Sequence, residues 1–156
     1  MDTPFSSERL LRVTAHTFEE TAFVFAEPDD APRPFAGPVS EVRLEFQGLR
    51  HGRLTLASTP AFGVELATNM LGIDPSDPAI PESADAALRE IVNILCGVVA
   101  EELSGRGVLC ELGLPVLQVV TPERVEVLRR EATYSVILLA GEGHRVDVMV
   151  FEGEAV

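Results

Sequence analysis

The stretch from Ser83 to Gly105 reads SADAALREIVNILCGVVAEELSG, and its apolar residues recur at the spacing of an α-helix. At about 100° per residue, these apolar side chains share one wide stripe. The stripe consists of Leu88, Ile91, Val92, Leu95, Val99 and Leu103. The sequence therefore predicts one long helix that turns this stripe towards the core.

The opposite face of this helix carries Glu90, Asn93, Gly97 and Glu101, at spacings of three, four and four residues. Asn is a mediocre helix former, and a glycine inside a helix costs roughly 1 kcal/mol relative to Ala. A carboxylate, an amide one turn later and a bare backbone beyond it form a surface that a partner can approach closely. The alternative, which spacing alone favours, is a solvated helix face without a function.

Upstream, two further helices are expected. The first begins near Ser6 or Ser7, either of which can cap it. Its predicted buried face consists of Leu11, Ala15, Phe18, Ala22 and Phe25. A loop follows over residues 27–34. The second helix begins at Thr59-Pro60, a cap followed by a first-turn proline, and ends at Gly72. Its core-facing residues are Phe62, Leu66 and Met70.

Two strands are expected between these helices. Apolar and polar residues alternate from Glu41 to Gln47, which is typical of a half-buried strand. The inward residues are Val42, Leu44 and Phe46, and the outward ones are Glu41, Arg43, Glu45 and Gln47. Residues 53–58 form the second strand.

The C-terminal third predicts three or four more strands. Residues 108–120 are nearly continuously apolar, which indicates a more central strand, although Pro115 implies a bulge or an edge. Residues 123–130 alternate weakly, and residues 133–140 and 145–151 form a hairpin. Because short turns join neighbouring strands, they must run antiparallel. We therefore predict an α+β fold, an antiparallel β-sheet with long helices packed on it.

The composition indicates one folded domain over residues 1–156. The chain is 46% hydrophobic and 24% charged, as expected of a globular protein. The chain has 25 acidic and 12 basic residues, and its formal charge is −13. All 12 basic residues are Arg. Such a surface repels phosphate backbones and anionic lipid, so we expect neither nucleic acid nor membrane partners. No transmembrane run or signal peptide is recognisable, so a cytoplasmic location is expected.

Other candidate sites are weaker. Cys96 and Cys110 could form a redox pair, but two free thiols are the expected state in a reducing compartment. His16, His51 and His144 are far apart in the sequence and lack partners at ligand spacing, so no metal site is expected. No phosphate-binding loop or nucleophile motif is present in the sequence.

The segment Glu90-Ile-Val-Asn93-Ile-Leu-Cys-Gly97 resembles the E-x-x-N-x-x-x-G signature helix of the CheC/CheX/FliY family of chemotaxis phosphatases. Met70-Leu71-Gly72 before it and Leu112-Gly-Leu-Pro115 after it also resemble CheX-type chains, and the order of elements agrees over residues 5–151. CheC and many FliY chains carry the motif twice. A single copy is similar to the CheX branch, although Val98 stands where CheX-type helices often have Asn.

This resemblance implies a phosphatase that hydrolyses the aspartyl phosphate of a CheY-type response regulator. Asn93 would orient the attacking water, and Glu90 would pair with the regulator's lysine. From the small size of glycine, and not from the resemblance, we expect Gly97 to keep the helix surface low. Glu101 continues the acidic face and could help to steer a partner, with a solvated helix end as the alternative. The required Mg²⁺ would belong to the regulator, so no cofactor is expected on this chain.

The resemblance also implies a homodimer formed through the sheets. An alternative is a non-catalytic module of the same fold that docks on a response regulator or flagellar motor component. The flanking resemblance favours the phosphatase.

Overall fold

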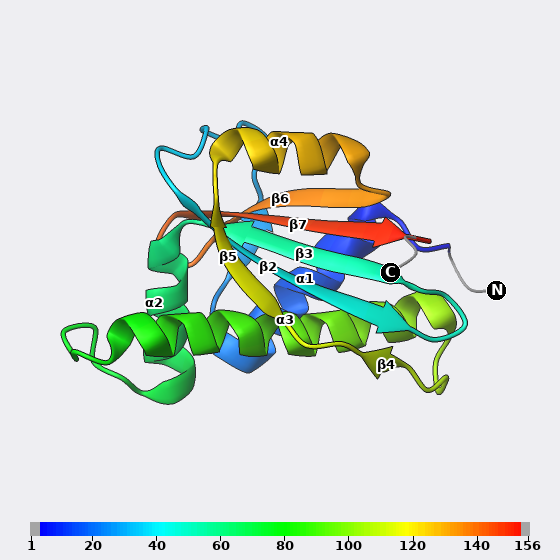
Figure 1. Ribbon diagram of the computed structural model, residues 1–156, viewed down its shortest axis with the longest axis horizontal. Coiled ribbons are helices and arrows are strands. Elements are labelled where there is room, and N and C mark those ends of the chain that lie inside the picture. Colours follow the sequence, from blue (N-terminus) through cyan, green and yellow to red (C-terminus); the bar gives the residue numbers. More distant parts are fainter. Residues whose placement is uncertain (1–3, 154–156) are drawn as a thin grey trace.

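The computed structural model describes residues 4–153, which form a seven-stranded antiparallel sheet and four helices (Figure 1). The elements, in chain order, are α1 (Ser7–Ala22), β1 (Ala26–Pro28), β2 (Val39–Gln47), β3 (Gly52–Ser58), α2 (Pro60–Leu71), α3 (Ile80–Ser104), β4 (Glu111–Leu112), β5 (Val116–Val120), α4 (Pro122–Glu131), β6 (Tyr134–Ala140) and β7 (His144–Glu152). The strand order is β1-β6-β7-β3-β2, and β4 and β5 both pair with the outer side of β2. The predicted α+β class is confirmed.

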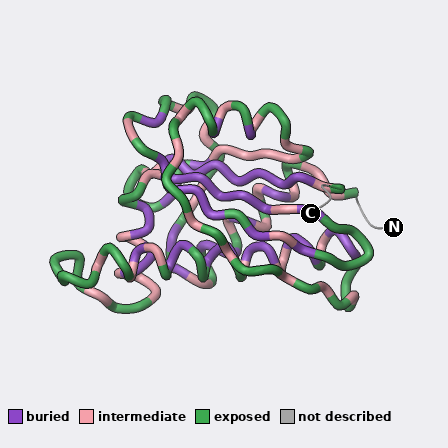
Figure 2. The backbone as a smooth tube through the Cα atoms, viewed as in Figure 1, coloured by how far each residue is buried: buried purple, intermediate pink, exposed green. Residues whose placement is uncertain are grey.

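The helices form two unequal layers on the sheet. Helices α1, α2 and α3 cover one face and enclose the larger core, to which β2, β3, β6 and β7 contribute alternate side chains. Helix α4 lies on the other face, where Val125 and Leu128 pack in a smaller cluster with Met149 and Phe151. Figure 2 shows the central strands buried for much of their length between these layers.

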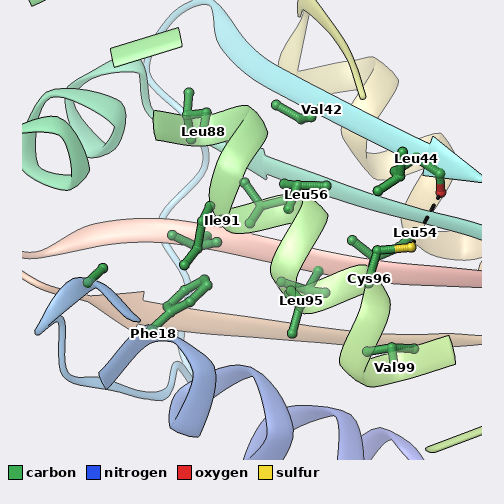
Figure 3. Close-up of a cluster of buried hydrophobic side chains, with 14 of the residues drawn as sticks. Phe18, Val42, Leu44, Leu54, Leu56, Leu88, Ile91, Leu95, Cys96 and Val99 are labelled. Atoms are coloured by element: carbon green, nitrogen blue, oxygen red, sulfur yellow. Dashed lines mark hydrogen bonds between the residues drawn. The ribbon is translucent and has the colours of Figure 1, made fainter. Parts of the chain in front are cut away.

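Helix α3 is buried along the predicted stripe. All six stripe residues are at most 5% exposed, and Figure 3 shows Leu88, Ile91, Leu95 and Val99 directed into the core. Full burial of one such side chain contributes roughly 1.5–3 kcal/mol. The helix begins at Ile80, earlier than predicted, because Pro81 fits its first turn.

Helix α1 begins as predicted but ends before the last residue of its predicted buried face. The Ser6 side chain caps it by accepting a hydrogen bond from the Arg9 backbone N–H at 3.1 Å. Phe23 then adopts a left-handed φ of 55°, which stops the helix at Ala22. Phe25 consequently lies outside the helix and is 74% exposed, so its predicted burial was wrong. The predicted loop that follows contains the end of the short strand β1, which pairs with β6.

The apolar segment over residues 108–120 lies at the edge of the sheet. It forms two short strands, β4 and β5, so the prediction of a more central strand was wrong. From Arg43 to Phe46, β2 advances three residues, whereas the opposing chain advances four, from Leu112 to Val116. The extra residue is accommodated at Gly113-Leu114-Pro115, so the bulge and the edge implied by Pro115 are both confirmed.

Residues 123–130 form most of helix α4, so a strand there was wrong. The Thr121 side chain accepts a hydrogen bond from the Arg124 backbone N–H, and Pro122 occupies the first turn. The buried residues Val125 and Leu128 are three apart, which is a helical spacing. The predicted hairpin is confirmed as β6 and β7.

Strand β2 follows the predicted alternation with one exception. Its inward residues Val42, Leu44 and Phe46 are at most 1% exposed. Glu41 was expected to face solvent, but it is 2% exposed. Its carboxylate accepts a hydrogen bond from the Gln118 side-chain amide at 3.0 Å, because β5 pairs alongside.

Candidate functional site

The predicted functional residues lie on the solvent side of α3. The side chains of Glu90, Asn93 and Glu101 are exposed, and Gly97 is half-buried. Their positions alternate in sequence with the buried stripe, so one helix supplies both a core face and an open face. The residues predicted for the core lie on the other side of this helix.

Helix α3 is fixed against three neighbouring elements, which makes its open face rigid. Gly63 of α2 lets that helix approach closely: a Cβ there would lie 3.0 Å from Leu88 Cδ1 and 3.1 Å from the Ala84 carbonyl oxygen. Arg9 of α1 forms an ion pair with Glu102 at 2.5 Å. On the sheet side, the Leu44 carbonyl oxygen lies 3.9 Å from the Cys96 sulfur, drawn in Figure 3.

Gly97 lies beside strand β4 and not beneath a second helix. A Cβ built on Gly97 would have one described neighbour within 4 Å, Leu112 Cδ1 at 3.8 Å, which is an ordinary van der Waals distance. The interior around Gly97 therefore has room for a methyl group. Dense packing does not explain why the chain has glycine there.

The bulge between β4 and β5 borders this part of the molecule. Leu114 at its tip is 87% exposed, and Gly113 donates a backbone hydrogen bond to the Glu45 carbonyl at 2.8 Å. A hollow of about 250 Å³ lies at the bulge, lined by Arg43, Leu44, Glu45, Gly113, Leu114 and Val116. Leu112 lies beside Gly97, which places this segment next to the open face of α3. The sequence predicted a bulge or an edge at Pro115, but not that this segment lies beside α3.

The chemistry of the open face is limited to hydrogen bonding and charge. Within residues 4–153, no group of three or more His, Cys, Asp or Glu side chains is placed to hold a metal ion. Asn93 offers an amide that can donate and accept, and Glu90 and Glu101 offer carboxylates. Such groups can orient a water molecule and pair with a cation on a partner.

His144 is held by residues in and next to α2, and neither cysteine forms a disulfide. His144 Nδ1 lies 3.1 Å from Thr59 Oγ1, and its Nε2 lies 3.4 Å from a Glu65 oxygen. Both cysteines are free thiols, Cys96 buried and Cys110 half-buried. Burial raises the pKa of the Cys96 thiol to about 12, so it is neutral at physiological pH.

A buried ion-pair network lies on the opposite face of the sheet. Arg145 donates to both carboxylate oxygens of Asp147 at 2.9 Å, to Glu126 at 3.3 Å and to the Arg33 carbonyl at 3.0 Å. Burial raises the pKa of the Asp147 carboxyl, and the Arg145 guanidinium opposes that shift. This network ties α4 to β7, and its partners are satisfied internally.

Among the helices formed by residues 4–153, none combines the length and the apolar character that a membrane span requires.

Comparison with known proteins relates this geometry to one family. A family model described as "Chemotaxis phosphatase CheX" matches residues 41–139. A search of the curated proteins gives no significant match.

Several solved structures share the fold. The CheX–CheY–BeF3–Mg²⁺ complex from Borrelia burgdorferi contains a chain that is 15% identical, with a TM-score of 0.66 and coverage of 97% of this chain and 100% of that one. CheX from Desulfovibrio desulfuricans is 17% identical, with a TM-score of 0.63 and coverage of 92% and 97%. FliY from Thermotoga maritima is 15% identical, with a TM-score of 0.59 and coverage of 98% and 92%.

Proposed function

The chain belongs to the chemotaxis phosphatase CheX family, and from that premise we propose that it accelerates hydrolysis of the aspartyl phosphate of a CheY-type response regulator. One structure of similar fold is a CheX–CheY complex with BeF3 and Mg²⁺, which supports a CheY-type partner. The observation that carries the proposal is the pair Glu90 and Asn93, exposed one turn apart on a helix whose other face is buried.

The proposed division of labour follows from the chemistry of the two side chains. Hydrolysis of an acyl phosphate needs a water placed in line with the phosphorus and the leaving carboxylate. The Asn93 amide can hold that water through its carbonyl oxygen and its N–H groups. The Glu90 carboxylate can pair with the regulator's lysine and so fix the docking geometry. Orientation of this kind can be worth roughly a hundredfold in rate.

The partner supplies what this chain lacks. We propose that Mg²⁺ and the phosphorylated aspartate belong to the regulator, so that this helix completes a site already present there. Gly97, half-buried beside Leu112, keeps the helix surface low enough for the regulator to approach. Glu101 lies one turn further along and adds an exposed carboxylate to the docking face.

A dephosphorylation assay tests the proposal. CheY-type regulators from the same genome are loaded with phosphate from acetyl phosphate in the presence of Mg²⁺, and loss of the phosphoryl group is followed with and without a tenth of an equivalent of this chain. We expect accelerated loss with at least one regulator, and no acceleration by the double variant Glu90→Ala/Asn93→Ala. Wild-type protein that binds a phosphorylated regulator without accelerating the loss would support the alternative, a non-catalytic docking module on a response regulator or flagellar motor component.

We also propose that two copies of the chain pair edge to edge through β5. Among the strands in residues 4–153, β5 pairs only with β2, which leaves its outer side open. Val116 and Val119 are 45% and 69% exposed. An open edge with exposed β-branched residues is a template for another strand. Light scattering should give a dimer mass that Val119→Lys reduces to that of a monomer, and a monomeric wild type would refute the pairing.

A further inference from the structure

The exposed face of α3 carries one cation. Arg89 is exposed and is the single basic residue of α3, which has five acidic residues, Glu82, Asp85, Glu90, Glu101 and Glu102. None of the ion pairs or side-chain hydrogen bonds formed among residues 4–153 uses the Arg89 guanidinium. Arg9, Arg50, Arg129 and Arg145 are paired with carboxylates, whereas Arg12, Arg43, Arg106 and Arg124, like Arg89, form no such ion pair among residues 4–153. What distinguishes Arg89 is its place: in a chain with a formal charge of −13, it is the one cation on the helix face that carries Glu90 and Asn93.

The position of Arg89 relates it to Asn93. Arg89 precedes Asn93 by four residues, so the two lie one above the other on the same face, with Cβ atoms about 6 Å apart. At about 100° per residue, Arg89 lies about 40° to one side of Asn93, and Glu90 about 60° to the other. Both charged residues lie about one turn N-terminal to Asn93, Arg89 on one side of its direction and Glu90 on the other.

We propose that Arg89 is a docking residue that pairs with a carboxylate of the receiver domain, on the side of Asn93 opposite Glu90. The inference rests on the proposed function. A receiver that holds Mg²⁺ beside a phosphorylated aspartate needs further acidic side chains as metal ligands, so carboxylates border its site. Arginine suits such a partner because its planar guanidinium binds a carboxylate through two parallel hydrogen bonds.

The direction of the side chain makes this a docking role. Long side chains on a helix lean towards its N-terminus, so the guanidinium points away from Asn93 and from the water that Asn93 would hold. Arg89 then contacts the rim of the receiver's site and not the reacting atoms. Arg89 and Glu90 place a positive and a negative charge at fixed positions on this face. These charges favour one docking orientation of the receiver and disfavour the reversed one.

The test compares steady-state kinetics of charge variants on the regulator that the wild-type chain dephosphorylates. Arg89→Gln should raise KM about tenfold with kcat within about twofold, and Arg89→Glu should raise KM further. Arg89→Lys should recover part of the loss, because it keeps the charge without the bidentate geometry. Raising NaCl from 50 to 300 mM should weaken kcat/KM less in Arg89→Gln than in the wild type.

The matched control is Arg124→Gln, which removes one exposed positive charge from α4 on the other face of the sheet. Kinetics and salt dependence of Arg89→Gln that match those of Arg124→Gln would overturn the docking role while leaving the proposed phosphatase intact. A fall in kcat at unchanged KM would also overturn it, because the guanidinium would then act on the reacting group. Failure of the wild type to accelerate dephosphorylation of any regulator would instead refute the proposed function itself.

Discussion

Replacing Gly97 with alanine should make the protein more stable and less active. Ala is better than Gly inside a helix by roughly 1 kcal/mol. The added Cβ would lie 3.8 Å from Leu112 Cδ1, with no other described atom within 4 Å outside its own helix, so no strain offsets that gain. For a chain of this size, about 1 kcal/mol corresponds to roughly 2–4 °C in Tm. The loss of activity follows if a partner must approach this backbone closely.

Gly63 provides the matched control because it is also a helical glycine. A Cβ there would lie 3.1 Å from the Ala84 carbonyl oxygen and 3.0 Å from Leu88 Cδ1, where α2 packs on α3. Overpacking of this kind costs about 1–3 kcal/mol, which exceeds the gain in helix propensity. Gly63→Ala should therefore lower Tm, whereas Gly97→Ala should raise it.

Thermal unfolding and the dephosphorylation assay, run on the same preparations, decide the question. Gly97→Leu extends the series, because a larger side chain should abolish regulator binding while the fold is retained. A lowered Tm in Gly97→Ala would show that the glycine serves packing that the geometry does not reveal. Full activity in Gly97→Leu would refute close approach of a partner at this turn.

Three further outcomes are expected. Glu90→Ala should mainly raise KM for the phosphorylated regulator, whereas Asn93→Ala should mainly lower kcat. Both variants should leave the unfolding free energy within about 0.5 kcal/mol, because the two side chains are exposed. Equal binding defects in the two variants would contradict the division of roles. Burial raises the pKa of the Cys96 thiol to about 12 from an ordinary value of 9.0, so the unfolding free energy should fall as pH rises above about 9. In urea titrations, Cys96→Ala should make the unfolding free energy less dependent on pH above about 9, whereas Cys110→Ala should not. Asp147→Ala should cost about 3 kcal/mol in urea unfolding, since it leaves a buried guanidinium without its main carboxylate, and a loss below 1 kcal/mol would show that the network is dispensable.

Patterns that reflect burial on one face were predictable from the sequence. The stripe of α3 and the alternation in β2 appear in the structure because a helix and a half-buried strand impose periods of 3.6 and 2 on their apolar residues. The exposure of the signature residues was predictable for the same reason. Once the stripe is assigned to the core, Glu90 and Asn93 must face solvent, and they do.

The strand assignment in the C-terminal third failed where apolar content was ambiguous. A continuous apolar run does not distinguish a central strand from an edge strand, because both contain Val and Leu. In residues 108–120, the apolar side chains Leu109, Leu114 and Val119 are 88%, 87% and 69% exposed, and Pro115 is the one residue of the run that pointed to an edge. Helix α4, in contrast, carried a readable signal: Thr121-Pro122 repeats the cap and first-turn proline of Thr59-Pro60.

The solvent face of α3 departs from local helix preference in a well-packed setting. The helix is buried on α1, α2 and the sheet, so selection for stability alone would favour alanine at Gly97, where a methyl group fits. It would also favour a better helix former at the exposed Asn93. Both departures lie on one face, one turn apart, next to the unpaired cation of Arg89. Helix-disfavouring residues that cluster on one exposed face, opposite a buried apolar stripe, are the pattern expected of a binding surface.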